Sequence, residues 1–341
     1  ILDGIGETDM VARYVLNGDV KDWSRNNLHG KLNGDGRFVD DKQFGKVLSL
    51  TGNNTFVTLP GEVLTGLESI SVAGWIYLHS TQSGQRFFDF GKNEKSHFSA
   101  SPAGSTQRPG YQAILTINGN NLPAIAPSVE PNKWVHLAVV IDISSRTTFI
   151  YLNGKQAGQA TGIPNELTQL FGNKNAKSTL YIGRSLAAAD PCLNALLHDL
   201  RIYRVPLSEK QVANIYNNAL HNNTSVSVNT TAKTEDDLQQ FATTEPQLYN
   251  AYLVSVANTA VSTEVGTLPR LPEYVNGVYK NAINGPKVRV LWPNPNNNNE
   301  VLKPGQYKIT GRVPGTALQP QVTVTVNEVA KAIAPKQTLQ A

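Results

Sequence analysis

The sequence has very few of the residues that build covalent or metal frameworks. Its 341 residues include one cysteine, Cys192, and one methionine. A single cysteine excludes an intramolecular disulfide framework and a cysteine-based zinc finger. The six histidines are scattered without the spacing of metal ligands, so no histidine-based metal motif is present either.

An excess of charge and long apolar runs are missing as well. Lys and Arg number 30 against 26 acidic residues, and the net charge of +4 gives a weak field for a chain of this size. No basic face interleaved with stacking aromatics is visible, so we predict no nucleic-acid binding. No apolar run approaches membrane-spanning length, and we predict no membrane span. We interpret residues 1–8 as a leader remnant, and the absence of a signal peptide does not argue against export.

Helical patterns are nearly absent, and the one convincing helix follows a strand near residue 200. Apolar and polar residues alternate from Leu196 to Tyr203, the period of a strand with two unlike faces. Pro206 ends this strand because proline has no N–H for a ladder. Ser208 and Gln211 form a capping box, and the apolar spacing that follows predicts one short amphipathic helix.

Short alternating segments separated by Gly and Asn turns fill the region before this helix. We expect strands at residues 11–16, 47–50, 56–59, 70–78, 87–90, 113–117, 134–141, 148–152 and 180–182. Asn153-Gly154 is the strongest hairpin signal, because this pair suits a type I′ turn. The pattern predicts an all-β sandwich. We interpret Trp75 and Trp134 as filling the interior of the sandwich rather than stacking on a ligand.

An ordered set of segments then resembles a known family. The segments are LNGDVKDWSRNNLHG, SISVAGWIYL, KWVHLAVVID, TFIYLNGKQAG, LYIGRS and LHDLRIY. Together they resemble a laminin-G-like (concanavalin-A-like) jelly-roll domain covering residues 9–221. The resemblance implies a jelly-roll sandwich with one short C-terminal helix.

A second domain is predicted at the C-terminal end. Residues 222–250 are rich in Asn, Thr, Asp and Gln without periodicity, and we interpret them as a linker. Short strands with Pro- and Gly-rich turns over residues 251–327 then predict an Ig-like β-sandwich. The segments VGTLPRLPEYV, VRVLWP, LKPGQYKITGRVPG and VTVTV resemble a group-four bacterial Ig-like domain. Residues 328–341 read as a tail or the start of a linker to a further domain.

Catalytic motifs are missing. Glycosidases on concanavalin-like folds place paired carboxylates on one strand face, and no such E-x-D-x-x-E run occurs here. Catalytic triads, H-E-x-x-H and phosphate-binding glycine loops are absent too. We therefore predict that this chain is not an enzyme, although its parent protein could be a glycoside hydrolase.

A structural calcium ion is the one cofactor that we predict. Asp19 and Asp22 lie in a Gly- and Asn-rich loop whose oxygens suit calcium. The resemblance implies a calcium ion between this loop and acids of the closing strand, which adds Asp199. His198 stands beside it where many relatives carry Asp, and a neutral imidazole is a poor calcium ligand. The alternative is that Asp19 and Asp22 make only turn hydrogen bonds.

Sugar binding in such modules uses loops that offer an aromatic ring and hydrogen-bonding side chains. The loops at residues 84–86, 92–111 and 184–194 carry residues of these types. The predicted carbohydrate-binding residues are Arg86, His97, Arg108, Tyr111, Arg184 and Asp190. The alternative for each is an ordinary solvated loop residue.

The two resemblances together indicate a function. The pair resembles the N-terminal accessory region of β-L-arabinofuranosidase-like (six-hairpin) glycoside hydrolases. We therefore expect a non-catalytic carbohydrate-binding or accessory module with an Ig-like spacer, from an exported bacterial glycoside hydrolase. The expected location is periplasmic, cell-surface or extracellular, and the expected state is a monomer. Its partners would be a plant-type or other complex polysaccharide and its own catalytic domain. The alternatives are a cell-surface adhesion or protein-interaction module, or a purely structural module packing on the catalytic domain.

Overall fold

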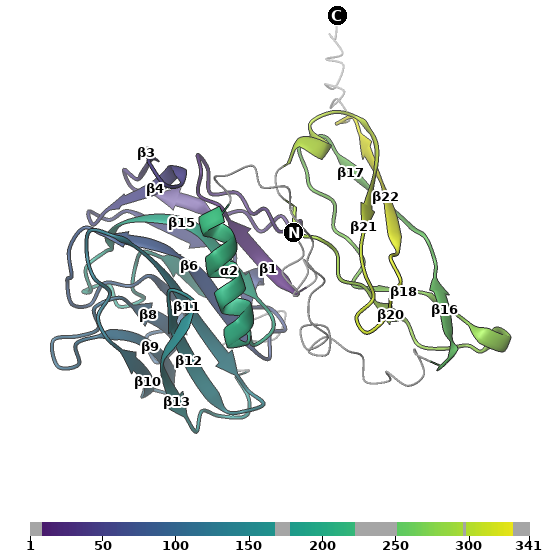
Figure 1. The fold of residues 1–341 in the computed structure, drawn as a ribbon. Helices are drawn as coiled ribbons and strands as arrows, with labels where there is room; N and C mark the ends of the chain where they lie inside the picture. The colour runs from purple at the N-terminus through teal and green to yellow at the C-terminus, as the bar shows by residue number, and fades with distance from the viewer. Residues whose placement is uncertain (1–8, 168–177, 222–250, 296–297, 330–341) are drawn as a thin grey trace, which may run out of the picture.

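Two β-sandwich domains make up the chain in a computed structural model (Figure 1). The structure describes residues 9–167, 178–221, 251–295 and 298–329. The predicted leader remnant 1–8, the predicted linker 222–250 and the tail beyond residue 329 lie outside these described residues.

The first domain is a sandwich of two antiparallel sheets. The front sheet runs in the order β13 (Lys155–Thr161), β12 (Thr147–Leu152), β11 (Trp134–Asp142), β6 (Ile70–Leu78), β15 (Asn194–Tyr203), β4 (Gly45–Thr51) and β3 (Arg37–Asp41), and β1 (Met10–Tyr14) pairs with β15. The back sheet runs in the order β10 (Asn120–Ala126), β9 (Tyr111–Ile117), β8 (Ser96–Ser101), β7 (Phe88–Asn93), β14 (Thr179–Ile182), β5 (Phe56–Leu59) and β2 (Lys31–Asn33). This arrangement confirms the predicted all-β jelly roll.

The apolar side chains of the alternating strands meet between the two sheets. On β6, Val72 and Ile76 point into this core, and Phe88 and Phe90 of β7 reach it from the back sheet. All four side chains are at most 1% exposed. Burying a large apolar side chain contributes about 1.5–3 kcal/mol, so this layer supplies most of the driving force for folding of the sandwich.

The predicted helix lies on the outer face of the front sheet (Figure 1). Helix α2 (Glu209–His221) begins at the predicted capping box, in which Gln211 N donates to Ser208 Oγ at 3.3 Å and Ser208 N donates to Gln211 Oε1 at 3.0 Å. Val212 and Ile215 pack with Ala73 and Tyr151 of the sheet. The helix therefore gives the front sheet a second buried face.

The prediction that Trp75 and Trp134 fill the sandwich interior was wrong. Both side chains lie on the outer face of the front sheet, which α2 covers in part. Trp75 is buried, but its ring stacks on Tyr216 of α2 at 5.4 Å between centroids, outside the sandwich core. Trp134 is half-buried on the same face, and its Nε1 donates to Asp41 at 3.2 Å. Phe44 bridges the two indole rings, with 5.0 Å between ring centroids in each case.

The second domain has the strands of an Ig-like sandwich. They are β16 (Leu253–Val256), β17 (Thr259–Glu264), β18 (Tyr274–Val275), β19 (Gly277–Tyr279), β20 (Val288–Arg289), β21 (Gly305–Thr310) and β22 (Gln321–Asn327). β22 pairs with β21 in antiparallel and with β17 in parallel orientation. Trp292 is fully buried at the centre of the core and donates its Nε1 hydrogen to Pro272 O at 2.8 Å. This domain confirms the predicted Ig-like fold.

The two domains touch through apolar and charged side chains. Leu291 of the Ig-like domain is fully buried in a cluster that includes Met10 and Tyr203 of the jelly roll. Beside it, Arg289 forms an ion pair with Asp9 of the jelly roll. Among the described residues, no helix is long and apolar enough to cross a membrane.

Candidate functional site

Three of the six predicted carbohydrate-binding residues, Arg86, Arg184 and Asp190, lie in or against one loop, and His97 is linked to it through Asp89. This β14–β15 loop, residues 183–193, connects the back sheet to the front sheet. Its base is closed by Leu193 N donating to Gly183 O at 2.9 Å, and Gly183 N donates to Phe87 O at 3.0 Å. The loop thus runs from a fixed position at the ends of two interior strands, one from each sheet.

Arg86 and Asp190 meet at the far end of this loop. Arg86 Nη2 lies 3.2 Å from Asp190 Oδ2, and Arg86 Nη1 donates to Gly84 O at 2.8 Å. The two side chains are 16% and 30% exposed, so both are reachable from solvent. Arg86 Nε is buried and has no hydrogen-bond partner among the described residues. The pair joins two loops and remains accessible to solvent.

Asp89 of β7 holds the middle of the β14–β15 loop through hydrogen bonds. This carboxylate is fully buried, and its Oδ2 accepts hydrogen bonds from Leu186 N at 2.9 Å and from Ser185 Oγ at 3.4 Å. Its Oδ1 lies 2.7 Å from Nδ1 of His97, a predicted site residue whose side chain is 14% exposed. A buried carboxylate with several donors holds its neighbours in one geometry.

Asp89 is a positioning residue of this candidate site that was not predicted from the sequence. It stands between Phe88 and Phe90, which point into the core, so strand alternation turns its side chain to the other face. An acid in the middle of an apolar strand is the signal that could have found it, since a buried acid needs donors nearby.

Arg184 lies at the near end of the loop on an aromatic base. Its guanidinium carbon is 4.6 Å from the ring centroid of Phe56 and 5.4 Å from that of Tyr181. Its Nη1 donates to Asn54 Oδ1 at 3.4 Å. These cation–π contacts orient the guanidinium, and they also cover the aromatic faces that a sugar ring would otherwise stack on.

The last two predicted residues behave differently from each other. Arg108 is exposed in a turn in which its N donates to Ser105 O at 3.1 Å, and Gly84 N links this turn to the Arg86 loop by donating to Gly104 O at 2.9 Å.

Tyr111 is fully buried in the core, and its hydroxyl donates to Ala138 O at 3.3 Å. Burial also raises the pKa of Tyr111. Tyr111 therefore cannot reach a ligand, and its prediction as a binding residue was wrong.

The predicted calcium loop is closed by protein hydrogen bonds. Asp22 is buried, and its Oδ1 accepts from Arg13 N at 2.9 Å and Ser24 N at 2.8 Å. Its Oδ2 accepts from Leu28 N and Ser24 Oγ, each at 2.9 Å. Asp19 is half-buried and accepts from Lys21 N at 3.0 Å. Both aspartates thus make the turn hydrogen bonds of the alternative interpretation.

Asp199, the third predicted calcium ligand, lies between two arginines. Arg13 Nε is 2.8 Å from Asp199 Oδ1, and Arg201 Nη2 is 2.7 Å from Asp199 Oδ2. Burial alone would raise the pKa of Asp199, but the two guanidiniums hold it well below its usual range. A calcium ion here would be repelled by both, so the residues around Asp199 do not fit one. Among the described residues, no three His, Cys, Asp or Glu side chains form a group that could hold a metal.

Comparisons with known proteins agree with the folds of both domains. The model of the concanavalin A-like lectin/glucanases superfamily matches residues 51–213. The model of the bacterial Ig-like domain (group 4) matches residues 256–316. The chain therefore combines a concanavalin A-like domain with a group-four bacterial Ig-like domain, as the sequence segments indicated. No curated protein matches the chain at a significant level.

Among solved structures, an arabinanase domain shares the jelly-roll fold. Domain 4 of a GH43 extracellular arabinanase from Geobacillus stearothermophilus, in complex with arabinotriose, has a TM-score of 0.51 and 23% identity, and the match covers 61% of this chain and 98% of that one. The binding domain of botulinum neurotoxin serotype D/C has a TM-score of 0.48 and 14% identity, covering 91% of this chain and 73% of that one. Trypanosoma rangeli sialidase in complex with the inhibitor DANA has a TM-score of 0.42 and 14% identity, covering 60% and 32%.

Proposed function

We propose that this chain is a non-catalytic carbohydrate-binding module with an Ig-like spacer, belonging to an exported bacterial glycoside hydrolase. The observation that carries the proposal is the Arg86–Asp190 pair, which joins two loops at one end of the jelly roll. This geometry supports ligand binding by the jelly roll, because the side chains of Arg86 and Asp190 are accessible to solvent and held in place.

The chemistry of the pair suits sugar hydroxyls. A guanidinium offers several N–H donors in one plane, and a carboxylate offers only acceptors. Neighbouring hydroxyls of a sugar can both donate and accept, so Arg86 and Asp190 together match them. Because Gly84 O already holds Arg86 and Asp89 already holds the loop, little side-chain entropy is lost on binding.

A neutral plant-type oligosaccharide is the ligand class that we propose for this site. The similar arabinanase domain was solved with arabinotriose, and this supports arabinan fragments as the first ligands to try. A parent enzyme of the β-L-arabinofuranosidase type agrees with such ligands and remains part of the proposal.

The acids of the site support binding rather than hydrolysis. A glycosidase needs two carboxylates facing one bond, about 5–5.5 Å apart in retaining enzymes and about 6.5–9.5 Å apart in inverting ones. Asp89 is fully buried with three partners, and Asp190 is paired with Arg86. Neither carboxylate is placed as a free nucleophile or as a general acid.

Calorimetric titration of the whole chain with arabinotriose, preceded by a glycan array, tests this function. We expect Arg86→Ala and Asp190→Ala each to weaken binding at least tenfold. Lys133→Ala is the matched control, because Lys133 forms an exposed ion pair with Glu130 that is not part of the loop site. Absence of binding to every neutral glycan, or equal affinity of the two site variants and the wild type, would contradict the proposal.

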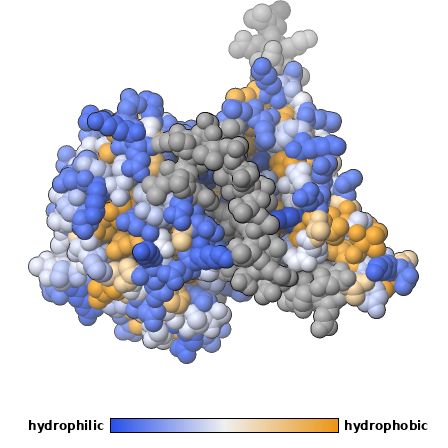
Figure 2. Space-filling model, in the orientation of Figure 1, coloured by the Kyte–Doolittle hydropathy of each residue, from blue (hydrophilic) through white to orange (hydrophobic). Residues whose placement is uncertain are grey.

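A second candidate is docking of the Ig-like domain on a catalytic domain. Val254 of β16 and Val278 of β19 are 52% and 49% exposed, and Figure 2 shows apolar residues gathered at that end of the Ig-like domain. Exposed apolar patches mark interaction surfaces. If this candidate is correct, Val254→Asp with Val278→Asp will abolish co-sedimentation with the parent's catalytic domain while sugar binding stays unchanged.

A further inference from the structure

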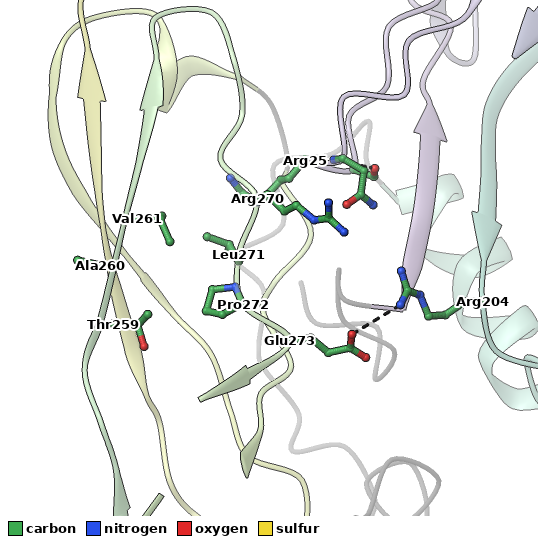
Figure 3. Close-up of a pocket in the computed structure, with 11 residues that line it drawn as sticks. Arg25, Arg204, Thr259, Ala260, Val261, Arg270, Leu271, Pro272 and Glu273 are labelled. Carbon is green, nitrogen blue, oxygen red and sulfur yellow. Dashed lines mark hydrogen bonds and ion pairs between the residues drawn. The ribbon is translucent and has the colours of Figure 1, made fainter. Parts of the chain in front are cut away.

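A pocket of about 500 Å³ lies between the two domains (Figure 3). It is separate from the β14–β15 loop, because none of its lining residues belongs to that loop. The jelly roll contributes Ser24, Arg25, Asn26 and Arg204, and the Ig-like domain contributes Thr259, Ala260, Val261, Arg270, Leu271, Pro272 and Glu273. Its volume falls in the range of about 300–1,000 Å³ that is typical of small-molecule sites.

The lining of this interdomain pocket is rich in arginine. Its charged residues are three arginines, Arg25, Arg204 and Arg270, and one acid, Glu273. Figure 3 shows Arg270 reaching from the Ig-like domain toward the jelly-roll loop that carries Arg25, with Arg204 and Glu273 farther along the gap. The formal charge of the lining is therefore positive, and an anion is the ligand that it attracts.

The one acid of the pocket is already neutralised by neighbouring cations. Glu273 Oε2 lies 3.6 Å from Arg204 Nη1, and Glu273 Oε1 lies 3.3 Å from Arg289 Nη1. Arg270 is exposed and forms no ion pair with any described residue. Arg270 thus keeps its donors for a ligand, and Arg204, whose side chain is 38% exposed, faces it from the jelly roll.

The remaining lining fits a sugar ring more closely than a bare inorganic ion. Leu271, Pro272 and Val261 supply an apolar wall for the C–H face of a ring. Asn26, Ser24 and Thr259 supply amide and hydroxyl groups for ring hydroxyls. A small number of polar groups on an apolar wall is the usual composition of a ligand site.

We propose that the interdomain pocket binds the carboxylate of a uronic-acid unit of an acidic polysaccharide. An arginine fork matches a planar carboxylate through two parallel hydrogen bonds, and Arg270 supplies such a fork from the Ig-like domain. Arg204 adds positive charge from the jelly-roll side. The ligand bridges the jelly roll and the Ig-like domain and stabilises their contact. This site is additional to the neutral-sugar site at Arg86 and Asp190, and it does not depend on it.

Titration of the whole chain with tri-galacturonate, compared with neutral galactotriose and with inorganic phosphate, tests the proposal. We expect the acidic trisaccharide to bind at least tenfold more tightly than either comparison ligand. Arg270→Ala and Arg204→Ala should each weaken this binding at least tenfold, and Arg270→Lys should restore it only in part. Arg37→Ala, an exposed arginine of β3, is the control for loss of one positive charge.

Three results would overturn the proposal. Phosphate binding as tightly as tri-galacturonate would show a general anion site, and unchanged affinity of Arg270→Ala would show that the pocket is not used. Arg86→Ala must leave tri-galacturonate binding unchanged. If Arg86→Ala abolishes tri-galacturonate binding, the acidic sugar binds at the β14–β15 loop. The pocket assignment is then wrong, while the proposed carbohydrate binding at Arg86 and Asp190 stands.

Discussion

Arg13 on β1 forms a two-point ion pair with Asp199 on β15, with Nε–Oδ1 and Nη2–Oδ2 distances of 2.8 and 3.2 Å. Arg201 completes the arrangement with a second guanidinium on Oδ2. Asp199 adopts a φ of 45°, at the point where the register of β15 with β6 shifts. Left-handed backbone costs a residue such as Asp about 1–3 kcal/mol, and the two guanidiniums fix the Asp199 carboxylate in this conformation. The contact holds the first strand of the domain to its last.

Removing the carboxylate should be strongly destabilising. Asp199→Asn leaves two buried guanidiniums without their counter-charge, and we expect a loss of about 3–5 kcal/mol in the free energy of unfolding. Asp40→Asn removes a carboxylate from an exposed pair with Lys46 and should change stability by less than about 1 kcal/mol. Urea unfolding of both variants measures the difference. Equal stabilities would show that the buried triad contributes nothing.

His136 should make the domain sensitive to mild acid. Burial lowers the pKa of His136 to about 3, while an unfolded histidine has a pKa of about 6.5. As the pH falls below 6.5, His136 binds a proton in the unfolded state, whereas in the folded state it stays neutral until the pH is near 3. Stability is therefore complete above pH 6.5 and is lost through this window, by at most about 1.4 kcal/mol per pH unit.

His136→Phe should remove this slope. The Nδ1 atom of His136 is buried without a hydrogen-bond partner among the described residues, so an apolar ring of similar size is tolerated beside Trp75. Melting temperatures between pH 4 and pH 8 measure the effect, with exposed His79→Gln as the control. An identical pH dependence in the wild type and in His136→Phe would refute this origin of the acid sensitivity.

Leu291 should couple the unfolding of the two domains. Its side chain is fully buried against the jelly roll, and Leu→Ala at such positions costs about 2–5 kcal/mol. We expect Leu291→Ala to separate or broaden the calorimetric transition, whereas Leu302→Ala, which is 51% exposed, leaves it unchanged. If Leu291→Ala has the wild-type transition, the apolar contact does not couple the domains.

Chelation tests the predicted calcium ion. Because four protein donors satisfy Asp22 and two arginines satisfy Asp199, we expect EDTA to leave the melting temperature unchanged. A lower melting temperature in EDTA that calcium restores would instead show that Asp19 and nearby carbonyl oxygens hold an ion, since a ligand of the folded state stabilises it by mass action.

Local patterns predicted the strands and the helix because each depends on neighbours in the sequence. The capping box at Ser208 is such a case, and the structure contains it. Which face of a strand is inner depends on distant segments, and this is why Trp75 was predicted in the sandwich core although it lies under α2. Tyr111 was assigned to a loop because the strand was predicted from residue 113, whereas β9 begins at Tyr111. The side chain therefore belongs to the core face that Ala113 and Leu115 share.

The sites that join distant segments were the least predictable. The link from Asp89 to Leu186 and the pocket between Arg25 and Arg270 both depend on how domains and sheets pack. No spacing in the sequence encodes such contacts. Residue type alone selected Arg86 and Asp190, and the structure showed that they meet.

A crystal of the chain soaked with arabinotriose would show directly whether the jelly roll binds sugar at this pair. We expect an intact sugar at the β14–β15 loop, with hydroxyls hydrogen-bonded to Arg86 and Asp190. Arabinotriose bound elsewhere on the jelly roll, or cleaved to shorter products, would contradict a non-catalytic binding site built on this pair.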